Sequence, residues 1–330
     1  MLRVVRISIL FTLLTALILS CKKEHTETTP TPPLDQDTLG VGWSKIAIDT
    51  GDYFVDIYFS ENIGFGISNN KIFRSINEGN SWTSVLKVGH SPYNIGMGSK
   101  DNMIAVCATG DIYYTSNGGN SFDSTFVSDS LLTDVYFVNA LTAYAAGLYF
   151  WKTTDGGKNW VKLYEFNNTT DDFKFSHAVY FINENIGWVI AANSGQARLW
   201  KTINGGATWE IFLGKAFSIY QTLFFIDKET GYYAGGNGLF KTANSGQNWK
   251  EVESVGGLPG TADVHFVSST TGYLSFYKMI YKTIDGGSTF TKEVALGQNN
   301  SKAGIIEIHF TDPNHGWACG YKGYILKYEN

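Results

Sequence analysis

The sequence is poor in arginine, cysteine and proline. Its 330 residues contain 25 lysines and arginines together against 30 acidic residues, for a formal charge of −5 at pH 7. Beyond the first twenty residues the only arginines are Arg74 and Arg198. Because a net acidic chain does not neutralise phosphates, this composition argues against nucleic acid as a partner.

The chain also lacks the motifs of common enzyme classes. It contains no His/Cys cluster at metal-binding spacing, no glycine-rich phosphate loop leading into a helix and no nucleophile elbow. His177, His265, His309 and His315 are scattered along the chain, and we interpret each as a packing or surface residue. The sequence therefore predicts no metal, no cofactor and no enzymatic activity.

No apolar run is long enough to span a bilayer. The run from Ile7 to Leu19 follows Arg3 and Arg6 and has the length of a signal-peptide core. Ile18-Leu19-Ser20-Cys21 resembles a bacterial lipobox, which predicts a signal peptide over residues 1–20 and a lipid on Cys21. A plain signal peptide with a chance cysteine is the alternative.

Residues 21–40 are rich in threonine and proline and cannot bury enough apolar surface to fold, so they are predicted to be a tether. Loss of the two N-terminal arginines with the signal peptide leaves 23 basic residues against 30 acidic ones, a charge of −7. The sequence thus predicts an exported protein, anchored by lipid to the bacterial cell envelope at the outer membrane, on its periplasmic or surface side.

One short segment occurs six times in the sequence. The copy from Trp151 to Leu163 reads Trp-Lys-Thr-Thr-Asp-Gly-Gly-Lys-Asn-Trp-Val-Lys-Leu. In every copy a Ser or Thr, then an Asp or Asn, are placed to bond backbone amides of a tight turn, and a closing Trp or Phe is placed to fill the gap between sheets. One oxygen ligand per turn is too few for calcium, so we interpret these side chains as structural. The Asp or Asn positions are Asn77, Asn117, Asp155, Asn204, Asn244 and Asp285.

A second repeat lies upstream of these segments: a Phe that precedes a polar turn and a Gly-aromatic pair. The Phe positions are Phe59, Phe137, Phe181, Phe225, Phe266 and Phe310. The first gap, 78 residues, is about twice the later ones of 41 to 44, and it holds a degenerate copy, Asn94-Ile-Gly-Met-Gly. Seven units of about 42 residues predict an all-β, seven-bladed β-propeller of four-stranded antiparallel blades over residues 41–330.

The two ends of the chain are predicted to share one blade. The seventh unit runs out of sequence before its turn segment and fourth strand, whereas Gly42-Trp43-Ser44-Lys45-Ile46 matches the strand that follows the turn in other copies. Closure of this kind removes the free sheet edges of an open array. Cys107 and Cys319 fall in units two and seven, too far apart for a disulfide, and are predicted to be buried thiols.

The recurring turn resembles the Asp-box, or BNR repeat, with Asn replacing Asp in four of six copies. Together with upstream pieces such as Val179 to Val189, it is similar to the Ycf48-like (HCF136-like) family of photosystem II assembly factors and their relatives in non-photosynthetic bacteria. The resemblance covers nearly the whole exported chain and implies a monomeric, non-enzymatic propeller that binds a partner. Family members that act on photosystems use an arginine-rich patch, so this arginine-poor chain is expected to keep the scaffold role without the photosystem role.

A carbohydrate-binding or glycoside-hydrolase-like propeller is the alternative, and a purely structural surface protein is a third hypothesis. Sialidases with this repeat need a triad of arginines, which the exported chain does not supply. An inverting glycosidase needs two carboxylates about 6.5 to 9.5 Å apart. The candidates are Asp134, Asp171, Asp172, Asp263 and Glu307, which we interpret as solvated loop residues.

Binding of an envelope or secreted protein, or of a glycan, is predicted on the face opposite the Asp-boxes. The longest connection, Glu165 to His177, lies on that face near the loop that ends at Arg198. Aromatic rings beside an arginine are typical of protein interfaces and also suit sugar stacking. The alternative is that rings on the second-to-third strand loops close the axial channel. The candidate residues are Tyr149, Phe150, Asp171, Asp172, Phe173, Phe175, Arg198, Tyr277, Tyr321 and Lys322.

Overall fold

Antiparallel strands make up nearly all the regular structure of the chain. The structure, a computed structural model, describes residues 36–46, 53–127, 131–165, 175–192, 197–217, 221–235, 238–255, 262–297, 304–321 and 324–330. The one helix in these ranges is the 3-10 turn η1 (Glu253–Val255). No helix in them is long and apolar enough to cross a membrane.

The strands form seven sheets: five consist of four consecutive strands, and the other two add β1 or β2 to consecutive strands from the C-terminal part of the chain. Blade one consists of β3 (Asp56–Ser60), β4 (Ile63–Ser68), β5 (Lys71–Ser75) and β6 (Thr83–Lys87). Blade two consists of β7 (Pro92–Met97), β8 (Met103–Cys107), β9 (Asp111–Thr115) and β10 (Asp123–Phe126). Blade three consists of β11 (Leu132–Phe137), β12 (Ala143–Gly147), β13 (Tyr149–Thr153) and β14 (Val161–Glu165). Blade four consists of β15 (Phe175–Phe181), β16 (Gly187–Ala192), β17 (Ala197–Thr202) and β18 (Glu210–Phe217). Blade five consists of β19 (Gln221–Phe225), β20 (Gly231–Gly235), β21 (Gly238–Thr242) and β22 (Lys250–Glu251). Blade six consists of β23 (Ala262–Phe266), β24 (Gly272–Phe276), β25 (Met279–Thr283), β26 (Thr291–Ala295) and β1 (Thr38–Leu39). Blade seven consists of β27 (Gly304–Asp312), β28 (His315–Tyr321), β29 (Tyr324–Glu329) and β2 (Trp43–Ile46).

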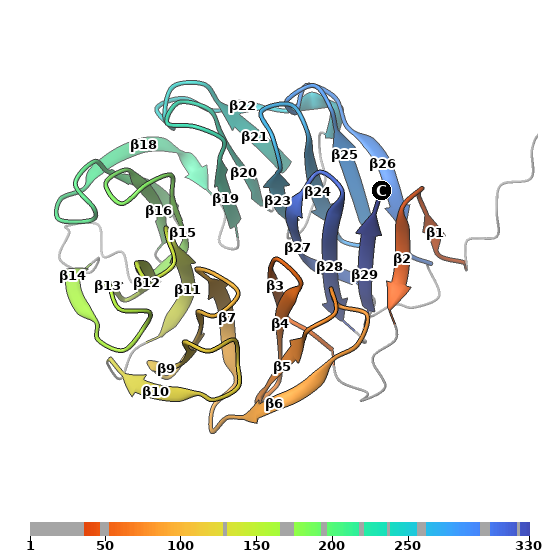
Figure 1. Ribbon diagram of the computed structural model, residues 1–330. Helices are drawn as coiled ribbons and strands as arrows, with labels where there is room; N and C mark the ends of the chain where they lie inside the picture. Colours follow the sequence, from red (N-terminus) through yellow and green to blue (C-terminus); the bar gives the residue numbers. More distant parts are fainter. Residues whose placement is uncertain are drawn as a thin grey trace, which may run out of the picture. The chain divides into compact units, whose positions relative to one another are not determined.

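The seven blades close into a ring. The first strand of each blade contacts the first strands of both neighbouring blades, from β3 through β7, β11, β15, β19 and β23 to β27 and back to β3. These strands surround the centre in Figure 1, and β6, β10, β14, β18 and β22 lie at the periphery. The predicted seven-bladed propeller is confirmed, including the degenerate unit, whose first strand is β7.

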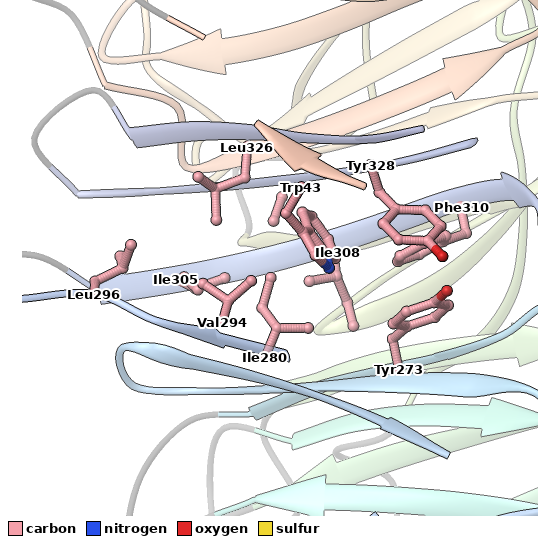
Figure 2. Packing of buried hydrophobic residues seen from close by; sticks show 11 residues of the cluster. Trp43, Tyr273, Ile280, Val294, Leu296, Ile305, Ile308, Phe310, Leu326 and Tyr328 are labelled. Carbon is pink, nitrogen blue, oxygen red and sulfur yellow. The ribbon is translucent and has the colours of Figure 1, made fainter. Parts of the chain in front are cut away.

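The predicted pairing of the chain ends is also confirmed. Strand β2 pairs with β29, with Trp43 opposite Tyr328 and Ile46 opposite Ile325. Trp43 packs on Tyr273 of blade six and Phe310 of blade seven, as Figure 2 shows, so it fills the gap that a closing aromatic fills elsewhere. Strand β1, within the segment predicted as a tether, adds a fifth strand to blade six by pairing with β26.

Five of the six upstream Phe rings stack on an aromatic ring of the preceding blade. Phe225 of blade five lies 3.6 Å from Trp188 of blade four, ring centre to ring centre, and the two planes are nearly parallel. Gly231 lies under the same Phe225 ring, where a Cβ atom would come within 2.5 Å of a ring carbon. The motif of a Phe before a Gly-aromatic pair is therefore a packing device: the glycine admits the Phe of its own blade, and its aromatic neighbour stacks on the Phe of the next blade.

Candidate binding site

The Asp-box side chains bond within their own turn. In blade three the Gly157 amide donates to the Thr153 hydroxyl (3.1 Å), which donates to Asp155 Oδ1 (2.8 Å), and the Asn159 amide donates to the same Oδ1 (3.0 Å). The same bonds recur in the boxes of Asn77, Asn117, Asn204, Asn244 and Asp285. These turns use their polar groups internally and offer little chemistry to a ligand.

The box turns also bind the preceding blade. Trp317 Nε1 of blade seven donates to the Glu78 carbonyl in the box of blade one (2.9 Å), and Trp188 Nε1 of blade four donates to the Ser245 carbonyl in the box of blade five (2.9 Å). Closing rings such as Trp160 pack against the apolar clusters between blades. The face that carries the boxes, the box face, is thus a set of contacts that hold blades together.

The opposite face, the loop face, carries the blade connections and the second-to-third strand turns. Tyr277 and Tyr321 lie there and are each about half exposed, together with Tyr93, which the sequence did not single out. Tyr321 packs on Tyr53, with ring centres 5.9 Å apart. Of the predicted rings, Tyr321 lines the axial cavity described below.

The prediction that Phe150 lies on this face is wrong. Its side chain is fully buried between blades three and four and stacks on Tyr144. Strand β13 begins at Tyr149, so the alternation of side chains sends Phe150 into the core while Tyr149 packs half-buried beside Lys162, whose Nζ lies 4.3 Å from the ring centre.

Arg198 is half-buried on β17, opposite Ala191. Phe175 is the first residue of β15, and its side chain is not described. The remaining candidates, Asp171, Asp172, Phe173, Lys322 and the lipid-attachment residue Cys21, lie outside the described residues. The partner face as a whole stays a prediction.

A cavity of about 690 Å³ lies where the innermost strands meet. Its wall takes residues from the first strand of all seven blades, together with Tyr93 and Tyr321 of the loop face. Two tiers of side chains form the wall. The outer tier, nearer the loop face, stands three residues before the upstream Phe of its strand, and the inner tier stands one residue before it.

The outer tier contains four carboxyl groups, the acid ring: Asp56, Asp134, Asp263 and Glu307. Three of them accept a backbone N–H from the next blade, with Ile95 donating to Asp56 Oδ2 (2.8 Å), Val179 to Asp134 Oδ2 (2.7 Å) and Ile308 to Asp263 Oδ2 (3.0 Å). Asn94, at the same position of blade two, accepts the equivalent bond from Val135 (3.0 Å). The tier therefore joins neighbouring blades around the axis.

Burial raises the pKa of these carboxyl groups. It raises the pKa of Asp56 to about 8 and that of Asp134 to about 7, although the amides of Ile95 and Val179 act in the opposite direction. Burial raises the pKa of Asp263 and, more strongly, that of Glu307, whose carboxyl also lies beside Asp263 and shares a hydrogen bond with it. The acid ring consequently retains protons at neutral pH.

The inner tier is an aromatic collar, broken at blade two by Gly96. Ring centres of sequential neighbours are 3.9 to 5.3 Å apart. The collar consists of Tyr58, Tyr136, Tyr180, Phe224, His265 and His309. Burial lowers the pKa of His265 to about 4 and that of His309 to about 3, so both imidazoles are neutral at pH 7.

One interpretation made from the sequence needs correction, because Asp134, Asp263 and Glu307 are strand residues of the cavity wall rather than solvated loop residues. His265 and His309 are packing residues, as interpreted, and they contact each other in the collar. The sequence signal that could have identified these acids is their position, since each stands three residues before an upstream Phe. Cys107 and Cys319 are free and buried, as predicted. Among the described residues, no group of three or more His, Cys, Asp or Glu side chains is arranged to hold a metal.

Several solved structures have a similar architecture. YCF48 bound to a D1 peptide is 17% identical, with a TM-score of 0.69 over 88% of this chain and 96% of that one, and YCF48 from Cyanidioschyzon merolae is 18% identical, with a TM-score of 0.68 over 87% and 98%. The fold is that of the YCF48 propellers. A GH74 xyloglucanase from Xanthomonas campestris is 12% identical, with a TM-score of 0.69 over 87% of this chain but 53% of the enzyme. No family model and no curated protein matches the sequence.

Proposed function

We propose that the protein is a non-enzymatic scaffold, exported and anchored to the cell envelope by lipid, that binds a partner protein on its loop face. The observation that carries this proposal is the set of half-exposed tyrosines, Tyr93, Tyr277 and Tyr321, on the face opposite the Asp-box turns. Large amphipathic rings of this kind are enriched at protein interfaces. The YCF48 structure with a bound D1 peptide supports it, since that propeller shares the fold and binds a peptide.

A glycoside hydrolase is the second candidate because the xyloglucanase has the same fold over about half its length. The carboxyl groups of Asp263 and Glu307 are hydrogen-bonded to each other. Glycosidase pairs stand about 5 to 9.5 Å apart, which leaves room for the scissile bond or a water. The geometry of this pair therefore favours binding over hydrolysis, and release of reducing sugar from xyloglucan by the purified protein would contradict that preference.

The proposed face can be tested by photo-crosslinking in the native envelope. Benzoylphenylalanine replaces Tyr93, Tyr277 or Tyr321 on the loop face, and replaces Ile284, an exposed residue of a box turn, as the matched control. Discrete adducts from the loop-face positions, and none from Ile284, are expected. Adducts from Ile284 alone, or from no position, would refute the proposed face.

A further inference from the structure

The axial cavity has an unusual combination of lining groups. Its wall combines the carboxyl groups of the acid ring with the rings of the aromatic collar, and no lysine or arginine occurs among the described residues of the wall. The volume of about 690 Å³ is that of a small-molecule pocket. Carboxylates and aromatic faces both attract cations, the first by charge and the second through the ring quadrupole.

The carboxyl charge is not required by the blade contacts. Asn94 accepts the Val135 amide just as Asp134 accepts the Val179 amide, at equivalent positions and at similar distances of 3.0 and 2.7 Å. A carboxamide thus performs the structural task without the cost of burying an ionisable group. Three ionisable groups, Asp56, Asp134 and Asp263, at positions where an amide would suffice indicate a task that needs negative charge.

His309 supplies an independent indication of a ligand. Its side chain is only 6% exposed and borders the cavity. Its Nε2 lies 2.9 Å from the Phe59 carbonyl and must therefore carry the proton, which leaves Nδ1 as a bare acceptor. No group in the described part of the chain donates to Nδ1, so this acceptor is left for whatever occupies the cavity.

We propose that the axial cavity binds an organic cation through its alkylammonium group, with the acid ring as the counter-charge, His309 Nδ1 as a hydrogen-bond acceptor and the aromatic collar as a cation–π surface. An ammonium carries only donors and positive charge, which matches a wall of acceptors and ring faces. The cavity shares Tyr93 and Tyr321 with the proposed partner face, but the acid ring and the aromatic collar are tested with small ammonium probes and the partner face by crosslinking, so failure of one proposal is distinguishable from failure of the other.

The raised pKa values add a measurable consequence. Asp56 and Asp134, with pKa values of about 8 and 7, face each other and Asp263, Glu307, Tyr58 and Tyr136 across the cavity. A bound cation stabilises their ionised forms and so lowers their pKa. Binding near pH 7 therefore releases protons, and affinity rises with pH up to about 8.

Calorimetric titration of the purified protein at pH 7.5 tests the site with three ammonium probes: putrescine, tetramethylammonium and the lysine side chain as Nα-acetyl-lysine methylamide. These stand for a free amine, a quaternary ammonium and a partner's lysine, while 1,4-butanediol and the Nε-acetylated lysine amide are neutral counterparts. At least one ammonium probe is expected to bind, and its neutral counterpart is not. Titrations in phosphate and in Tris should differ in heat because protons are released.

Asp134→Asn keeps an acceptor for the Val179 amide and removes the charge, so it should fold normally and weaken binding by about tenfold or more. Asp56→Asn gives the same test at a second blade. Asp285→Asn is the matched control, because four other boxes already carry Asn at that position. The inference is overturned if no ammonium probe binds, if neutral counterparts bind equally, or if folded Asp134→Asn and Asp56→Asn both bind as tightly as the parent.

Discussion

The stability of the propeller is expected to fall as the pH rises from about 6.5 to 8. Asp56 and Asp134 have pKa values of about 8 and 7 in the folded protein, because burial disfavours their charged forms, against about 3.9 in an unfolded chain. Between the unfolded and folded values the folded state binds protons that the unfolded state has lost. The free energy of unfolding therefore decreases as the pH rises through this window.

The histidines set the lower limit of the pH range in which this fall in stability is expected. Burial lowers the pKa values of His265 and His309 to about 4 and 3, so below about 6.5 these residues give stability the opposite slope. Above about 6.5 the slope from the carboxyl groups outweighs that from the histidines, which fades as the unfolded imidazoles lose their protons. At about 1.4 kcal/mol per proton per pH unit, Asp56 contributes more than Asp134, and the two together contribute about 2 kcal/mol between pH 6.5 and 8.

Urea unfolding followed by tryptophan fluorescence at several pH values measures this change. The double variant Asp56→Asn with Asp134→Asn should show a smaller fall, because only the raised pKa values of Asp263 and Glu307 remain, and it should be at least as stable as the parent at pH 8, since each amide retains an acceptor for the next blade. Asp285→Asn should keep the parent's pH dependence. A parent stability that is flat or rising from pH 6.5 to 8, or a fall of the same size in the double variant, would refute the assignment of protons to Asp56 and Asp134.

Four further changes test the fold and the anchor. Asp155→Ala is expected to cost about 1 to 2 kcal/mol and Trp160→Ala about 3 kcal/mol in urea unfolding; a loss of partner binding at unchanged melting temperature would instead assign these residues to a binding site. Deletion of residues 42–48 should leave β29 without its partner and cause loss of solubility, whereas an equally cooperative monomer would show that β2 is dispensable. Cys21→Ser should release the protein from membranes in a fractionation experiment without altering its fold, and continued partition with lipid would disprove lipidation at this residue.

The repeats were sufficient to predict the architecture because each encodes a local event. A Thr, an Asp and a Gly at fixed spacing specify one turn, and their bonds run within five residues of each other. Chain closure was also predictable, because Gly42 to Ile46 reads as a fourth strand without a blade and the last unit as a blade without a fourth strand.

The location of individual side chains was less predictable. Phe150 was assigned to a loop because it precedes the box, yet the residue three before the box Ser or Thr is apolar in every copy and buried. These residues are Ile72, Ile112, Phe150, Leu199, Leu239 and Ile280. A one-residue difference in where a strand begins reverses the side to which its side chains point.

The sequence by itself determined the number of blades, the turn chemistry and the pairing of the chain ends, since periodicity and short-range bonding carry that information. The acid ring and the aromatic collar were decided only by the tertiary structure. Asp56, Asp134, Asp263 and Glu307 are each separated by at least 44 residues along the chain and stand beside one cavity because seven innermost strands converge on one axis. Their raised pKa values depend on that convergence, because desolvation arises from neighbouring blades and not from neighbours in sequence.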